Sequence, residues 1–158
     1  MNAGFAIELA LRCLLVVLFL PFSALDKIID FRASVAQAKQ IVPSGSAATA
    51  LILAGLAVEI VMPLGIITGV ADRLAAFVLG GYCVVTALLW KQFWKPGDFW
   101  RAGESQGRNL FWDFLKNLSL AGGLLLLTFG TTNMNVGRFL THPLASSHPY
   151  AIHQKAQP

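Results

Sequence analysis

Four long apolar segments, each near the length needed to cross a bilayer, dominate this sequence. They occupy about residues 7–25, 47–67, 73–90 and 110–129. An α-helix rises ~1.5 Å per residue, so about 20 mostly apolar residues span the hydrocarbon core. The pattern therefore predicts an all-α fold, an integral membrane bundle of four transmembrane helices.

Composition supports lipid as the solvent of this chain. Hydrophobic residues make up 56% and charged residues 13%, whereas soluble domains carry about 25% charged residues. A chain of 158 residues is too short to hide so much apolar surface inside itself. The net charge of +4 comes from single Lys and Arg residues that form no basic run. We therefore expect the bilayer as a partner and exclude nucleic acid.

The segments divide the chain into a transmembrane domain, residues 1–130, and a polar tail, residues 131–158, that we expect to be flexible. Residues 26–46 form a polar loop in which residues 31–41 favour a short interfacial helix. Lys and aromatic residues at segment ends are typical of membrane interfaces. The interface anchors that we predict are Lys27, Arg73, Trp90, Phe93 and Trp94.

Orientation follows from the basic residues of the short loops, because cytoplasmic loops are enriched in Lys and Arg. The first and third loops together hold seven: Lys27, Arg32, Lys39, Lys91, Lys95, Arg101 and Arg108. The opposite side holds Arg73, Arg138 and Lys155, with Arg12 added if its side chain reaches that surface. We expect a multi-pass protein of the bacterial inner membrane with loops 1 and 3 in the cytoplasm and both termini outside. Glu8 and Arg12 inside the first segment indicate a retained helix rather than a cleaved signal.

Ionisable residues at bilayer depth are costly, so each needs a reason. The clear cases are Arg12, Glu59 and Lys116. Measured from the terminal side, they lie about 8, 13 and 20 Å deep at ~1.5 Å per residue. Arg12 and Glu59 therefore differ by only ~5 Å in depth. We expect them to form a buried ion pair between the first two helices.

A second polar layer is predicted nearer the loops. Ser23 and Asp26 share a helical face with Arg12. Asp26 also lies near the membrane depth of Asp113 and Lys116 on the fourth helix. The predicted buried network is therefore Arg12, Ser23, Asp26, Glu59, Asp113, Lys116 and Asn117. In one interpretation these residues only hold the helices together, and in the other they form a ligand or quinone site.

The sequence carries no stand-alone catalytic motif and predicts no catalytic residue. His142, His148 and His153 all lie in the tail, so no transmembrane helix offers an axial histidine, and we expect no haem. Their spacing is a poor metal signature, and we expect no metal site. Cys13 and Cys83 lie singly in apolar segments and form no redox-active pair.

The polar pattern resembles the DoxX family of small bacterial membrane proteins over about residues 10–128. The resemblance rests on short strings around Arg12, Asp26, Glu59 and Asp72, and most specifically on Phe114-Leu115-Lys116-Asn117-Leu118-Ser119. Relatives often have Gly where this chain has Pro21 or Ala24. The resemblance implies a four-helix inner-membrane protein. It further implies redox-linked partner subunits, since some relatives belong to thiosulfate:quinone oxidoreductase.

Three hypotheses of function follow. In the first, the protein is a redox-associated membrane subunit that binds a quinone or another small apolar molecule inside the bundle. In the second, it is a non-catalytic assembly or scaffold protein whose buried charges only fix helix pairing. A small transporter is the third, although no inverted repeat is apparent. The sequence leaves open whether the chain acts as an enzyme.

Overall fold

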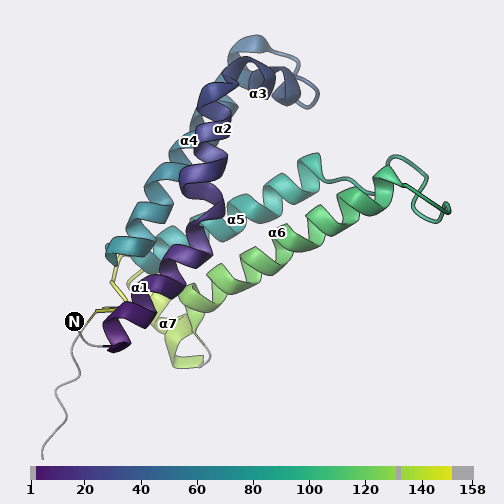
Figure 1. Cartoon of the computed structure of the whole chain (residues 1–158). Coiled ribbons are helices and arrows are strands. Elements are labelled where there is room, and N and C mark those ends of the chain that lie inside the picture. The colour runs from purple at the N-terminus through teal and green to yellow at the C-terminus, as the bar shows by residue number, and fades with distance from the viewer. Residues whose placement is uncertain (1–2, 131–132, 151–158) are drawn as a thin grey trace, which may run out of the picture.

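The computed structural model describes residues 3–130 and 133–150, and this part of the chain is helical with connecting loops (Figure 1). Four helical segments are long and apolar enough to cross a membrane. The predicted class, an all-α integral membrane protein with four transmembrane helices, is confirmed. The elements are α1 (Ala3–Val16), η1 (Leu18–Ser23), α2 (Ala24–Ile29), α3 (Phe31–Ala38), α4 (Gly45–Thr68), α5 (Asp72–Trp90), α6 (Gln106–Phe129) and α7 (Asn133–Thr141).

The helices extend beyond the apolar segments, and side-chain caps at Ser44 and Ser105 fix where α4 and α6 begin. The first span covers Ala3–Ile29, longer at both ends than the predicted 7–25. The last begins at Gln106 rather than near residue 110. There the Ser105 side chain accepts from the Arg108 backbone N–H at 3.1 Å. Such caps satisfy N–H groups that the first turn of a helix leaves unpaired.

The first span bends in the middle. Leu20 has non-helical backbone angles, φ −120° and ψ 113°, and Pro21 follows it inside η1. Proline lacks the N–H that a continuous helix needs, so the helix changes direction at this point. Beyond the bend, α2 lies beside α4 (Figure 1).

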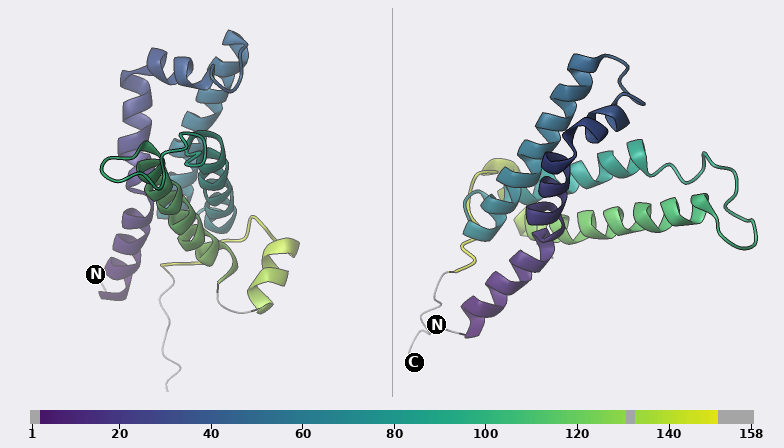
Figure 2. Two further views of the ribbon diagram at one scale, coloured as in Figure 1. Left: turned by 90° about the vertical axis from the view of Figure 1, so that its right-hand side faces the viewer. Right: turned by 45° about the horizontal axis from the view of Figure 1, so that its top comes forward.

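The spans form two arms that diverge from the end of the molecule where α7 lies (Figures 1 and 2). One arm holds α2, α3 and α4, and the other is the antiparallel pair α5 and α6. The arms meet in a core that includes Val16, Phe19, Ile66, Leu79 and Leu124, all buried. This packing fixes one end of the molecule and leaves space between the arms at the other.

The first loop contains the helix that the sequence predicts. Helix α3 spans Phe31–Ala38 and begins at Asp30, whose side chain accepts from the Ala33 N–H at 3.3 Å. Ala38 packs against Ala48 and Ile52 at the start of α4, in a small buried cluster of its own. Helix α3 thereby covers the far end of the first arm.

The C-terminal segment returns to the bundle. After α7, the chain reaches Ser147, which bonds to Asp72 at the start of α5, and Tyr150, whose hydroxyl donates to the Ile67 carbonyl. The predicted domain boundary, residues 130/131, falls between α6 and α7. His153 and Lys155, in the last part of the predicted tail, lie outside the described residues.

Candidate functional site

A buried carboxylate, Glu59, lies midway along α4 and is only 2% exposed. Lys27 donates to both of its oxygens, at 2.8 and 2.9 Å. The Ser23 hydroxyl donates to Oε1 at 3.0 Å, and the Tyr82 hydroxyl donates to the same oxygen at 2.8 Å. A carboxylate inside an apolar bundle is stable only with this kind of charge and hydrogen-bond compensation.

Each partner of Glu59 is positioned by local helix geometry. Ser23 and Lys27 are four residues apart and therefore share a helical face, and the Lys27 ammonium also donates to Ser23 Oγ at 2.7 Å. The bend at Leu20 and Pro21 directs this face toward α4. Tyr82 reaches Glu59 from α5, so the network connects the two arms.

The network forms part of the wall of a cavity of about 800 Å³ between the arms. The cavity is mainly apolar, and its polar groups gather at Glu59 and at the loop end. Of the predicted site residues, it brings together Ser23, Asp26, Glu59 and Asn117, and it adds Lys27 and Trp90, which the sequence assigned to the interface. Its apolar wall includes Phe19, Phe22, Leu51, Ile52, Val58, Val85 and Leu89.

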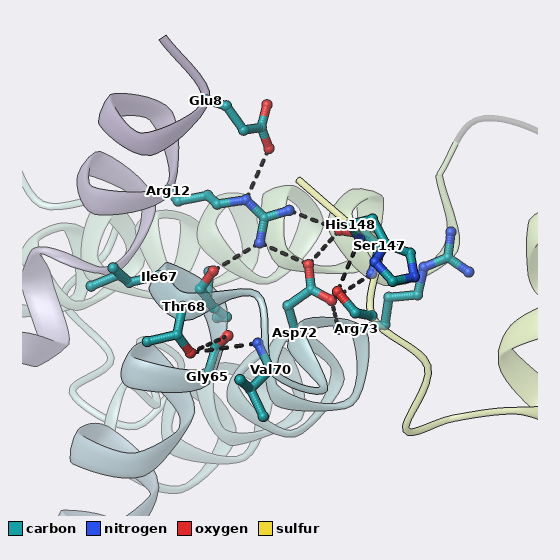
Figure 3. Close-up of polar contacts among 12 residues, drawn as sticks. Glu8, Arg12, Gly65, Ile67, Thr68, Val70, Asp72, Arg73, Ser147 and His148 are labelled. Atoms are coloured by element: carbon teal, nitrogen blue, oxygen red, sulfur yellow. Dashed lines mark hydrogen bonds and ion pairs between the residues drawn. The ribbon is translucent and has the colours of Figure 1, made fainter. Parts of the chain in front are cut away.

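A second buried cluster closes the opposite end of the bundle (Figure 3). Arg12 is 3% exposed and Asp72 is fully buried. Arg12 Nη1 donates to Asp72 Oδ2 and to the Ile66 carbonyl, each at 2.8 Å, and its Nε donates to Glu8 at 2.9 Å. The cluster ties α1 to the turn between α4 and α5.

The C-terminal segment completes this second cluster. Ser147 Oγ accepts from Arg12 Nη2 at 3.0 Å and donates to Asp72, while the Ser147 N–H donates to Asp72 Oδ1 at 2.9 Å (Figure 3). Pro149 lies against Gly69, where a Cβ would meet its ring at 3.0 Å. Gly69 has φ +77°, a conformation that glycine adopts without strain. The cluster is therefore built from four separate parts of the sequence.

The predicted ion pair between Arg12 and Glu59 is wrong. Arg12 pairs with Asp72, and Glu59 pairs with Lys27. Similar depth was a correct but insufficient criterion, since depth does not say which way a side chain points around its helix. The sequence does not predict Asp72 as the partner of Arg12, because Asp72 begins a helix beside Arg73 and resembles an ordinary surface residue there. Nothing in the sequence near Ser147 marks it as a partner.

Two of the remaining predicted charges, Asp113 and Lys116, belong to a third cluster on the second arm. Asp113 accepts from Lys91 at 3.0 Å and from Lys116 at 3.2 Å. Asn117 donates to the Asp113 carbonyl at 2.9 Å. Lys116 itself lines a separate groove between α1 and α6. The predicted loop-side layer of Asp26, Asp113, Lys116 and Asn117 is thus divided: Asp26 and Asn117 line the Glu59 cavity. The predicted burial of Lys116 is wrong, because its side chain is 75% exposed.

The third loop is an aromatic cluster around Phe93, whose ring lies 5.0 Å from Trp94 and 5.0 Å from Phe111. Asp98 accepts from the N–H groups of Gly107 and Gln106, each at 2.8 Å. The bond from Gly107, then that from Gln106, lowers the pKa of Asp98 against its partial desolvation. At the other end, desolvation raises the pKa of Tyr150. Within residues 3–130 and 133–150, no three His, Cys, Asp or Glu residues gather as metal ligands would.

The family model for DoxX matches residues 7–92, more than half of the chain. This chain belongs to the DoxX family. The matched region of this DoxX protein runs from α1 to the end of α5, and it contains both buried ion pairs, Arg12–Asp72 and Lys27–Glu59. No curated protein and no solved structure matches the chain.

Proposed function

We propose that this DoxX protein is a redox-associated membrane subunit that binds a quinone-like molecule in the cavity between its two arms. The observation that carries the proposal is Glu59, a buried carboxylate with lysine, serine and tyrosine donors, in the wall of a mainly apolar cavity of about 800 Å³. Small-molecule sites generally measure about 300–1,000 Å³ and combine apolar walls with a few polar groups.

The polar groups suit the head of such a ligand. A quinone carbonyl needs hydrogen-bond donors. Lys27 and Tyr82 donate to Glu59 in the ligand-free protein, and each would turn a bond from Glu59 to the quinone carbonyl when the ligand binds. The amide of Asn117 and the carboxylate of Asp26 line the same space. The apolar wall, with Phe19, would hold the ring and tail. The proposed ligand residues are therefore Glu59, Lys27, Ser23 and Tyr82, with Asp26 and Asn117 around them.

Reduction of a quinone to a quinol consumes two electrons and two protons. A redox protein subunit bound to this chain would deliver the electrons. The groups in the cavity would bind the head and exchange protons with it, since carboxylates and lysines are common proton carriers. In this role the protein is a subunit of a quinone-linked oxidoreductase rather than an enzyme alone.

The test is isothermal titration calorimetry, in which a short-chain ubiquinone is added to the full-length protein purified in detergent and its dissociation constant is measured. Glu59→Gln and Tyr82→Phe should each weaken binding by about tenfold, because each removes a charge or donor at the head. Glu104→Gln, in the exposed third loop, is the matched control and should bind as the wild type does. Absence of saturable binding by the wild type would overturn the proposal.

A second candidate function is a non-catalytic assembly protein whose buried charges only fix helix pairing. The Arg12 cluster favours it, since the buried guanidinium is held by hydrogen bonds to the Ile66 carbonyl, Asp72 and Ser147 of the same chain. Under this alternative, Glu59→Gln would alter stability while ubiquinone binding remained absent in every variant.

We also infer that the protein lies in the bacterial inner membrane with loops 1 and 3 in the cytoplasm. Seven basic residues in these two loops support this orientation. A cysteine placed at exposed Glu104 in the third loop, in a Cys13→Ala background, should react with an impermeant maleimide only after the membrane is opened. Labelling of intact spheroplasts would reverse the orientation.

A further inference from the structure

Lys116 presents a charge where a lipid-facing helix would not carry one. It lies midway along α6, about 15 Å from the start at ~1.5 Å per residue, and its side chain is 75% exposed. Its carboxylate partner Asp113 is 40% exposed. Charged groups at this depth normally face protein or water because contact with lipid is costly. Another protein surface should therefore cover this side of α6.

The rest of the exposed face has the composition of a helix–helix interface. Ser119 follows Lys116 by three residues, is exposed, and lies within about 60° of Lys116 around the helix axis. Small and polar residues let transmembrane helices approach closely in lipid. Lys116 and Ser119 also line a groove of about 750 Å³ against Leu14 and Leu18 of the first span. We call this surface the α6 face: Trp112, Asp113, Lys116 and Ser119.

Charge identifies the occupant. Asp113 and Lys116 have opposite charges and are three residues apart, ~4.5 Å along the helix. If two α6 helices run parallel about a two-fold axis, the Lys116 side chain of each can reach Asp113 of the partner subunit. A two-fold interface is self-complementary in this way by symmetry. Each Asp113 would keep its bond from Lys91 of its own chain.

We propose that the α6 face is a homodimer interface, in which Lys116 binds Asp113 of the partner subunit and the small side chain of Ser119 allows close packing. The interface is separate from the Glu59 cavity, so it stands whether or not that cavity binds a quinone. The exposed leucines of α1 beside the groove, Leu11 and Leu14, would extend the contact.

The first test is disulfide cross-linking of the full-length protein in membranes. The background is Cys13→Ala, which removes the exposed native thiol, and Cys83 stays because it is buried. Ser119→Cys should give a dimer-sized product on mild oxidation. Ala57→Cys is the matched control, exposed on α4 at similar depth and outside both cavities. Equal cross-linking of both variants, or none at Ser119→Cys, would overturn the proposal.

The decisive test exchanges the charges between two copies carrying different tags. Lys116→Asp alone places two carboxylates opposite two carboxylates, and Asp113→Lys alone places lysines opposite lysines. Co-expressed, the two variants restore both cross-chain pairs, so mixed dimers should exceed each like-charged dimer by about tenfold. Random pairing, in which mixed dimers exceed each like pair by about two to one, would contradict the proposal. The proposal would also be contradicted if every combination, including the wild type, eluted at the volume of a monomer in size-exclusion chromatography.

Discussion

Lys27 and Glu59 form a two-point ion pair in which the lysine Nζ lies 2.8 Å from Oε1 and 2.9 Å from Oε2. The pair joins two helices of one arm, and Tyr82 extends it to the other arm. The Glu59 side chain is 3% exposed and that of Lys27 is 21% exposed. The carboxylate therefore depends on its partners, while the lysine keeps access to the cavity.

Removing Lys27 alone should destabilise the protein strongly. Lys27→Leu leaves a buried carboxylate without its cation, and breaking such a pair typically costs about 3–5 kcal/mol. The double change Lys27→Leu with Glu59→Leu removes both charges and should recover most of the lost stability. Thermal unfolding in detergent, followed by circular dichroism, measures the difference. Both variants should lose quinone binding, which separates the role in folding from the role in binding.

A double variant as unstable as Lys27→Leu would show that the charges do more than compensate each other. The matched control for Lys27→Leu is Lys95→Leu, which removes an exposed lysine of the third loop. Surface ion pairs contribute about 0–1 kcal/mol, so this control should unfold close to the wild-type temperature.

The Arg12 cluster should behave as a structural support only. Asp72→Asn leaves Arg12 without its buried anion and should cost about 3–5 kcal/mol, as expected for a broken buried pair. Quinone affinity, measured by the same titration on the protein that remains folded, should stay within about twofold of the wild type. A selective loss of affinity without loss of stability would place Arg12 in the binding site instead.

Hydropathy alone predicted the fold, because lipid requires long apolar helices whatever their partners. It also identified Arg12 and Glu59 as buried. Their partners could not be deduced, because pairing depends on rotation about each helix axis and on the bend at Leu20, which redirects Lys27. The loop-end lysine looked like an interface anchor for the same reason.

Other parts of the candidate site left weaker signals. Tyr82 lies in the third apolar segment and reads as one more large side chain, although a buried tyrosine hydroxyl usually needs a partner. Applied to Tyr82, that rule could have indicated a contact between its hydroxyl and the buried Glu59. Ser147 could not be predicted, because it contacts Asp72, 75 residues earlier in the sequence, and no local sequence pattern indicates this contact.

Ser147 should anchor the C-terminal segment. Ser147→Ala removes a donor to Asp72 and an acceptor for Arg12, so it should cost about 1–3 kcal/mol. Hydrogen–deuterium exchange of residues 142–150 should rise in this variant. His142→Ala, an exposed change in the same segment, is the control and should leave exchange unchanged. Equal exchange in Ser147→Ala and wild type would show that the contact adds nothing to the anchoring.

The start of α6 should loosen in acid because of Asp98. Bonds from Gly107 and Gln106 lower the pKa of this carboxyl in the folded protein. A lowered folded pKa means that the stabilisation is complete above the ordinary value of ~3.9 and is lost as pH falls through the lower folded value. Amide exchange at Gln106 and Gly107 should rise over that window in the wild type. In Asp98→Asn it should show no such pH dependence.

The most direct measurement of the central claim is the content of the Glu59 cavity in protein taken from its own membrane. Lipids extracted from purified full-length protein are quantified by mass spectrometry, with Ala54→Phe, which fills the cavity, and Ala57→Phe, an exposed change on the same helix outside it. We predict quinone enriched over bulk lipid in wild type and Ala57→Phe, and lost in Ala54→Phe. Quinone at the bulk ratio in all three proteins would contradict the account.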